Sequence, residues 1–471
     1  MADLAGDGPA GARAAPSGPQ TSGVKMESDF SVRKIKIGAV CLFGQTFATS
    51  ILPFMALSYV LTDMTKDFGW SRAEFGFANS FLMWSGALVL WALGRLADKV
   101  GVRPVILLGT LAVGLVTLAL AHVQNLWQFY LCFALLGVFG STGASYSKVI
   151  ASLFTQNRGK AMAIFGAEGT AVRFFIPIIM AFMILHYSWR GLFTAMGWTI
   201  LAVTPLVYFG LVEPGAYKIN FRLFGRRQAA LDAPRHEAPP PMTFDGMTIK
   251  EAMRDKVFWL ILGSTLFAAV IANGMMTNVI AALQDKGFSQ VTVAQYMSMA
   301  TLVGLGGTFL GGFLVDKWQS AKVGVPFHLI SALGAFLTMI VMPQLGGKPV
   351  LFLAISCTGF ALAAALPMAA YFQTRFFGLR SFAEIFGFQS MIQAACMGFA
   401  PPLMGWIYDT FHSYTIGFGL QIVSALFAAA VFMILPRYRY SANIGAMPAP
   451  PKGGEDSSAP SGVSPAVLPA A

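Results

Sequence analysis

Long apolar stretches separated by short polar segments run along most of the chain. A membrane-spanning helix needs roughly 20 predominantly apolar residues, and stretches of about that length recur throughout the sequence. The first six lie near residues 36–60, 74–96, 104–122, 127–152, 162–185 and 191–212, and six more lie near residues 257–283, 292–315, 324–344, 349–373, 382–407 and 414–436. The pattern predicts an all-α integral membrane protein with twelve transmembrane helices.

Composition leads to the same class. Only 11% of the residues are charged and 56% are hydrophobic, whereas about a quarter of a soluble domain is charged. The first 30 residues contain no apolar core of a signal peptide, so we expect the first span to act as the targeting signal. The four cysteines fall within predicted spans without the spacing of a disulfide or metal site. We therefore expect neither a cofactor nor a metal ion.

The net charge of +11 is distributed unequally over the predicted loops. One set of loops, together with both chain ends, carries Arg33, Lys34, Lys36, Arg95, Lys99, Arg103, Arg158, Lys160, Lys218, Arg222, Arg226, Arg227, Arg235, Lys250, Arg254, Lys256, Lys317, Lys322, Arg375, Arg380, Arg437 and Arg439. The opposite loops carry only Lys66, Arg72, Arg190, Lys286 and Lys348. The positive-inside rule then places both termini in the cytoplasm. We expect a multi-pass protein of the cell inner membrane, in contact with the lipid bilayer and without a nucleic-acid partner.

Polar segments rich in proline and glycine divide the chain into five sections. Residues 1–32 and 439–471 are expected to be disordered cytoplasmic tails. Residues 33–213 and 253–438 each contain six predicted spans, and residues 214–252 form a cytoplasmic linker between them. This organisation predicts two six-helix bundles.

Short segments of the first bundle recur in the second at a nearly constant offset. Residues 67–71 (DFGWS) return 218 residues later as residues 285–289 (DKGFS), and the pair Gly94 and Asp98 returns at the same offset as Gly312 and Asp316. Residues 44–46 and 164–166 also match residues 263–265 and 385–387, at offsets of 219 and 221. Parallel repeats of this kind are typical of transporters whose solute site lies near the membrane midplane between the halves, and which work by alternating access.

The loop at residues 94–103 (GRLADKVGVR) resembles the signature loop of the major facilitator superfamily, and residues 312–317 are a weaker copy. The resemblance covers residues 33–438 and implies the major facilitator fold, with two pseudo-symmetric six-helix bundles. A carboxylate beside basic side chains can bind guanidinium groups or a helix N-terminus, and such contacts break when the halves rock. We assign a gating role to Asp98, Arg95, Arg103 and Asp316; the alternative is a solvated loop with a helix-ending glycine.

Three further segments are similar to the monocarboxylate and oxalate/formate porter branch of that superfamily: residues 68–72 (FGWSR), 158–161 (RGKA) and 405–409 (GWIYD). This resemblance implies an organic anion substrate. The branch typically carries a cation in the middle of the eighth span, but residues 297–304 contain none. We therefore expect the countercharge for the anion elsewhere.

Ionisable residues within a span are costly and usually functional, and the fifth span contains two of them. Arg173 lies roughly 22 Å beyond Arg158 at about 1.5 Å per residue, and its planar fork suits a carboxylate. Glu168 could take up and release a proton and so couple transport to a proton gradient. The alternatives are structural ion pairs, of Arg173 with Glu168 and of Glu168 with Lys148.

Uncharged polar residues complete the candidate substrate site. They are Gln45, Thr49, Tyr146, Asn273, Thr277, Gln389 and Gln393. For each of them the alternative is a hydrogen bond between helices.

No phosphate-binding loop, metal cluster or nucleophile–base pair appears in the sequence, so we do not expect an enzyme. The sequence predicts a secondary transporter for a small organic anion, with protons as the coupling ion, and a monomer. The alternatives are an organic-anion exchanger, a proton-driven efflux pump for amphipathic compounds, and a receptor with the same fold.

Overall fold

The computed structural model describes residues 32–47, 49–100, 102–143, 145–146, 149, 168–211, 246–318, 320–344, 347–378 and 380–440. Helices in these ranges lie on every one of the twelve predicted stretches. Eight of the described helices are long and apolar enough to cross a membrane. Apart from an isolated bridge between Gly246 and Gly378, we find no pairing of strands in the described residues, so the all-α prediction is confirmed.

The first group of helices comprises α1 (Val32–Phe47), α2 (Ile51–Phe68), α3 (Arg72–Val100), α4 (Val102–Leu120), α5 (Leu126–Gly140) and α8 (Glu168–Gly210). The first predicted span is therefore longer than expected and consists of two helices. The predicted fifth and sixth spans are two parts of α8, which is interrupted at Ser188, where φ is 62°. Asn125 accepts a hydrogen bond from the backbone of Gln128 and so begins α5.

The second group comprises α9 (Ile249–Arg254), α10 (Lys256–Asp285), α11 (Gln290–Trp318), the short 3₁₀ helix η1 (Ala321–Val323), α12 (Gly324–Ile340), α13 (Gly347–Phe377), α14 (Phe382–Met397), α15 (Ala400–Phe411) and α16 (Thr415–Ile434). The eleventh predicted span is divided between α14 and α15. Two prolines, Pro401 and Pro402, stand in the first turn of α15, where a missing N–H breaks no helical hydrogen bond.

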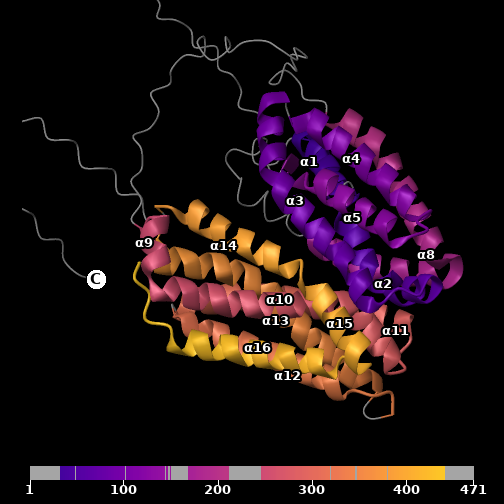
Figure 1. The fold of residues 1–471 in the computed structure, drawn as a ribbon. Helices are drawn as coiled ribbons and strands as arrows, with labels where there is room; N and C mark the ends of the chain where they lie inside the picture. The colour runs from indigo at the N-terminus through magenta and orange to yellow at the C-terminus, as the bar shows by residue number, and fades with distance from the viewer. Residues whose placement is uncertain are drawn as a thin grey trace, which may run out of the picture.

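The two groups form two helical bundles that meet at one end and diverge towards the other (Figure 1). The meeting end contains α2, α15 and the start of α11, and we call it the joined end. The opposite end, near α9, is where the predicted linker enters the second bundle, and we call it the linker end. This arrangement places the contacts between the bundles at one end of the molecule.

At the linker end, the two segments that flank the second bundle are fixed to the end of α13. Met247 N–H donates to the carbonyl of Phe377 at 2.8 Å, and Arg439 and Tyr440 N–H donate to the carbonyl of Arg375 at 3.2 and 3.1 Å. Arg439 also forms an ion pair with Asp255. Arg439 and Tyr440, which the sequence predicts to lie in the disordered tail, are thus bound to the bundle.

Candidate functional site

An ion pair links the two bundles at the joined end. Arg72, the first residue of α3, donates from Nη1 and Nη2 to the two carboxylate oxygens of Asp285 at 2.8 and 3.1 Å. The Arg72 side chain is only 11% exposed, and its guanidinium lies 3.4 Å from the centre of the Tyr408 ring. Arg72 Nη1 also donates to the hydroxyl of Tyr414 at 3.0 Å. Because Arg72 belongs to the first bundle and its partners to the second, these contacts hold the joined end closed.

A second carboxylate binds the beginning of the same helix. Asp409 of α15 accepts hydrogen bonds from the backbone N–H groups of Arg72 and Ala73 at 3.0 and 2.9 Å. The first N–H groups of a helix have no partner within it and carry a partial positive charge. Asp409 therefore satisfies two of them from across the interface between the bundles.

Further hydrogen bonds extend this interface along α2 and α3. Ser58 Oγ donates to the Met276 carbonyl at 3.0 Å, and Ser80 Oγ donates to the Gly398 carbonyl at 2.6 Å. The interface also contains the pairs Thr62–Gln284, Gln290–Tyr59 and Trp84–Ala395. Side chains from each bundle thus connect it to the other, and the two bundles can separate without breaking a helix.

Close backbone approach makes Gly405 essential to this interface. A Cβ atom at Gly405 would overlap the backbone of Arg72 and would lie 2.5 Å from Ala73 N. Backbone atoms cannot move aside by a change of rotamer, so any side chain there forces α15 away from α3. We call the set Arg72, Asp285, Tyr408, Asp409 and Tyr414 the joined-end gate.

The substitution Gly405→Ala is expected to loosen the joined end, because an overpacked contact costs about 1–3 kcal/mol. A cysteine introduced at Ser58, which is 9% exposed, will then react faster with a membrane-impermeant maleimide in a background without the natural cysteines. Gly419→Ala is the matched control, since nothing lies within 4 Å of a Cβ at Gly419. An unchanged maleimide rate in Gly405→Ala would contradict the role of this close approach.

Beside the gate, Lys286 is held at the end of α12. Its ammonium group donates to the carbonyls of Thr338 and Met339 at 2.7 and 2.6 Å. These carbonyls belong to the last turn of α12, where a helix has no partners of its own for them. Partial burial lowers the pKa of Lys286.

The predicted substrate residues of the second bundle all form hydrogen bonds within that bundle. Asn273 donates to the Met397 carbonyl at 3.2 Å, and Gln393 donates to Thr265 Oγ1 at 3.1 Å. Thr277 donates to the Gly274 carbonyl at 2.9 Å, and Gln389 accepts from Gln373. Asn273, Gln389 and Gln393 therefore make the hydrogen bonds between helices that the alternative role requires, whereas Thr277 bonds within its own helix.

In the first bundle, the predicted substrate residues Gln45, Thr49 and Tyr146 lie at or beside the end of α1. Thr49 donates to the carbonyl of Gln45 at 2.8 Å. Tyr146 is fully buried, and a Cβ atom at Gly44 would overlap its ring. The structure therefore brings Tyr146 against α1, next in sequence to Gln45.

The charged candidates are described only in part. Glu168 and Arg173 lie in the first turns of α8, Arg95 and Asp98 lie in α3, and Asp316 lies in α11, but their side chains are outside the described part of the structure. Lys148 is also outside it. Their assigned roles stay predictions.

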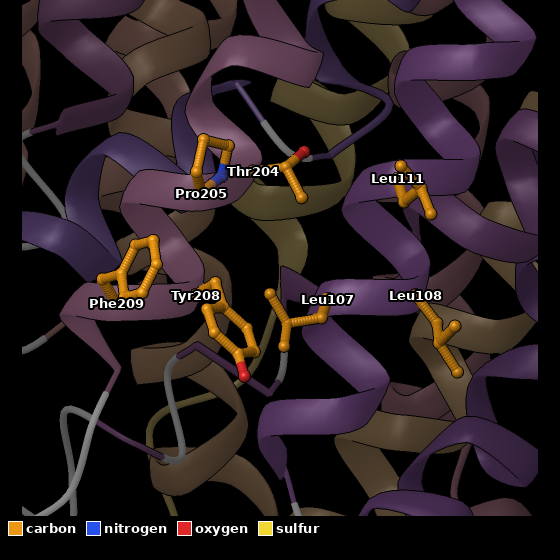
Figure 2. Close-up of a pocket in the computed structure, with 7 residues that line it drawn as sticks. All are labelled: Leu107, Leu108, Leu111, Thr204, Pro205, Tyr208 and Phe209. Atoms are coloured by element: carbon orange, nitrogen blue, oxygen red, sulfur yellow. The ribbon is translucent and has the colours of Figure 1, made fainter.

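Arg103, the remaining gating candidate, contacts its own bundle in this conformation. Its Nη2 donates to the carbonyl of Tyr208 at 2.8 Å, and its guanidinium lies 4.6 Å from the Tyr208 ring centre. Next to this contact, a shallow groove lies between α4 and α8 (Figure 2), lined by Leu107, Leu108, Leu111, Thr204, Pro205, Tyr208 and Phe209. Leu108 and Phe209 are 65% and 71% exposed, as expected of side chains that face lipid, and the groove contains none of the predicted substrate residues.

No motif of the sequence predicts the joined-end gate by itself. In the charge pattern, Arg72 is one of the few cations of the opposite loops. The signal was nevertheless present, because Arg72 ends the segment 68–72 and Asp409 ends the segment 405–409, the two segments that carry the resemblance to a porter branch. Asp285 begins the repeated segment 285–289. Their pairing depends on how the bundles are arranged.

Two helical bundles that are joined at one end by separable side-chain contacts are the architecture of two-bundle membrane transporters. Residues 39–348 match the family model described as Major Facilitator Superfamily, and the chain belongs to this superfamily. It is a membrane transport protein rather than an enzyme. The superfamily predicted from residues 94–103 is confirmed, whereas the porter branch stays a prediction.

Similar proteins span most of the chain. A gallate transporter of Pseudomonas putida is 22% identical over 383 residues, which cover 74% of this chain and 83% of the relative. The multidrug resistance protein MdtL of a Shewanella species (strain ANA-3) is 22% identical over 388 residues, which cover 80% and 90%. Among solved structures, an inward-facing, occupied bacterial homologue of the human lysosomal transporter Spinster aligns with a TM-score of 0.64 and 16% identity, covering 85% of this chain and 95% of that one.

Proposed function

We propose that this protein is a secondary active transporter that carries a small organic anion, a mono- or dicarboxylate or an aromatic acid, together with protons. The observation that carries the proposal is the ion pair of Arg72 with Asp285 across the joined end, opposite a linker end at which the bundles diverge. An interface of this kind can open at one end while it closes at the other. Alternating access requires that behaviour.

The positive-inside pattern of the loops gives the proposed orientation. The charge pattern of the sequence assigns the basic loops, the linker and both termini to one side, so we place the linker end in the cytoplasm. The joined end then faces outwards, and the described conformation is one in which the outer side is closed. Solute would leave or enter from the cytoplasmic side in this state.

An organic anion is supported by two features. Arg173 lies near the start of α8, directly before the stretch Phe174–Gly210 that is long and apolar enough to cross a membrane, and an ionisable residue at such a depth is usually functional. A similar protein is named as a gallate transporter, and gallate is an aromatic acid. A small anion would bind to Arg173 between the bundles, near the midplane.

The experiment that tests the proposal is uptake by purified protein in proteoliposomes. Radiolabelled acetate, propionate, lactate, succinate, malate, benzoate, 4-hydroxybenzoate and gallate are compared, with an inside-alkaline pH gradient and without it. Acetate, propionate and benzoate also cross a bilayer unaided as uncharged acids and collect on the alkaline side, so uptake is counted above that of protein-free liposomes. We expect gradient-driven accumulation above that level for at least one acid. Uptake equal to that of protein-free liposomes for all of them, or protein-dependent uptake that the gradient leaves unchanged, would exclude proton-coupled transport of such acids.

The substitution Glu168→Gln is expected to abolish accumulation driven by the pH gradient while exchange of the same acid across the membrane continues. Glutamine has nearly the shape of glutamate but takes up no proton, so only the coupling step is lost. The matched control is Glu74→Gln, because Glu74 is exposed at the start of α3. Persistence of gradient-driven accumulation in Glu168→Gln would remove Glu168 as the coupling site.

A second candidate function is proton-driven efflux of amphipathic compounds, which similarity to a multidrug resistance protein favours. Export of tetraphenylphosphonium from loaded vesicles, without uptake of any acid, would support it. A third candidate, an organic-anion exchanger, requires uptake that depends on an acid inside the vesicles rather than on the pH gradient.

A further inference from the structure

A buried amide lies at the interface between the bundles without a partner within the protein. Asn79 of α3 is 1% exposed, and neither its Oδ1 nor its Nδ2 meets a hydrogen-bonding group of the described residues. Leaving a buried polar atom without a hydrogen bond costs about 1–3 kcal/mol. Both atoms of Asn79 are therefore available to a ligand.

Asn79 borders a small cavity that both bundles enclose. Thr277 and Asn278 of α10 line the side formed by the second bundle, and the remaining wall is apolar apart from backbone. The space open to the centre of a water molecule is about 10 Å³, which is close to the minimum for one water. In the closed state the cavity thus has room for a single oxygen atom beside the Asn79 amide.

A chain of hydrogen bonds leads from the gate to this cavity. Arg72 donates to the hydroxyl of Tyr414, which donates in turn to Asn278 Oδ1 at 3.0 Å. Asn278 Nδ2 lies 3.2 Å from Thr277 Oγ1, to which it donates. Since Asn79 follows Arg72 by seven residues on α3, it lies about 10 Å deeper along the helix. Asn79 and Thr277 thus line the same cavity from opposite bundles, directly behind the gate.

The hydrogen-bonding groups of Asn79 and Thr277 determine which chemical group can bind in this cavity. The Asn79 amide supplies both a donor and an acceptor. Thr277 gives its proton to the Gly274 carbonyl and already accepts from Asn278 Nδ2, which leaves one lone pair on its oxygen. A ligand oxygen that accepts from Asn79 Nδ2 and donates its proton to Thr277 Oγ1 bonds to both residues. A hydroxyl group meets this requirement, whereas a methyl group or a second carboxylate does not.

We propose that Asn79 and Thr277 form an outer subsite that binds a hydroxyl group of the transported acid when the joined end opens, and one water when it is closed. This inference rests on the proposed function and specifies the substrate class as hydroxylated organic acids. A site built to bond a hydroxyl group discriminates strongly against the analogue that lacks it. The subsite therefore sets specificity rather than overall rate.

The test compares pairs of acids that differ by one hydroxyl group: lactate with propionate, malate with succinate, and 4-hydroxybenzoate with benzoate. The readout is the ratio of kcat/KM within a pair, because a shift between the conformations of the transporter affects both acids equally. We expect the wild type to prefer a hydroxylated member, and Asn79→Leu to reduce that preference about tenfold, the value of roughly one hydrogen bond. Thr277→Val, in the other bundle, is also expected to reduce the preference for the hydroxylated acid. It provides the test if Asn79→Leu fails to fold.

Ser80→Ala is the matched control. Ser80 is the neighbour of Asn79 on α3 and is also fully buried, but its hydroxyl is already bonded to the Gly398 carbonyl. Its loss alters rates and leaves the ratio unchanged. An unchanged ratio in Asn79→Leu and in Thr277→Val, or the absence of any preference in a wild type that transports these acids, overturns the subsite alone. If the wild type transports none of the acids, the proposed function fails and the subsite fails with it.

Discussion

Replacing Asp285 by asparagine is expected to shift the protein towards a state in which the joined end is open. Asparagine retains one acceptor for Arg72 but loses the charge and the bidentate geometry of the ion pair. Hydrogen bonds to charged groups contribute about 1.5–3 kcal/mol. An energy in the range of about 1–3 kcal/mol changes the ratio of the open to the closed state about five- to 150-fold. Spin labels at Lys66 and Phe411, both exposed near the joined end, will report a longer distance in the variant.

The same variant is expected to transport more slowly, because a carrier that cannot close its outer end completes fewer cycles. Glu74→Gln provides the matched control, since the Glu74 carboxylate accepts from Ser71 N–H in its own bundle and makes no hydrogen bond or ion pair with the second bundle among the described residues. A distance distribution in Asp285→Asn identical to that of the wild type would show that the ion pair does not hold the gate.

The second large effect is expected for Arg173. Arg173→Gln removes the proposed countercharge, and truncating one partner of a buried charge pair costs roughly 2–5 kcal/mol, so kcat/KM for the transported acid will fall by more than tenfold. Arg173→Lys retains the charge without the planar fork and will show a smaller loss. Uptake kinetics in proteoliposomes measure both variants.

Two further variants distinguish a solute-binding role of Arg173 from a structural role. Arg190→Gln, at an exposed position of the same helix, is expected to leave the kinetics unchanged. If Arg173 instead forms a structural ion pair with Glu168, Arg173→Gln will lower thermal stability and the added substitution Glu168→Gln will restore it. Wild-type kcat/KM in Arg173→Gln would rule out a role in solute binding.

The aspartate that both copies of the repeated segment share has different partners in the two bundles. Residues 67–71 and 285–289 occupy equivalent positions at the ends of α2 and α10. In the first copy, Asp67 accepts a hydrogen bond from Trp189 Nε1 at 2.7 Å within its own bundle. In the second copy, Asp285 pairs with Arg72 of the other bundle. Equivalent carboxylates thus serve the internal packing of one bundle and the contact between the two.

The helical class, the positions of the spans and the superfamily were determined by the sequence alone. Apolar stretches of about 20 residues have no other stable form in lipid than a helix, and helices lie at each predicted stretch. The loop at residues 94–103 identified the superfamily that the family model confirms. Local composition sufficed for these predictions because each depends on one short segment.

Only the tertiary structure decided which polar residues meet. Arg72 and Asp409 are separated by 337 positions, and they pair because α3 and α15 pack against each other through Gly405. The tertiary structure also decided that Asn273 and Gln393 are bonded to neighbouring helices, whereas the amide of Asn79 is not. A hydrogen bond requires atoms within about 3 Å, and the spacing of residues along a helix cannot specify the distance between two helices. The gate and the proposed outer subsite therefore follow from packing between bundles and not from any single motif.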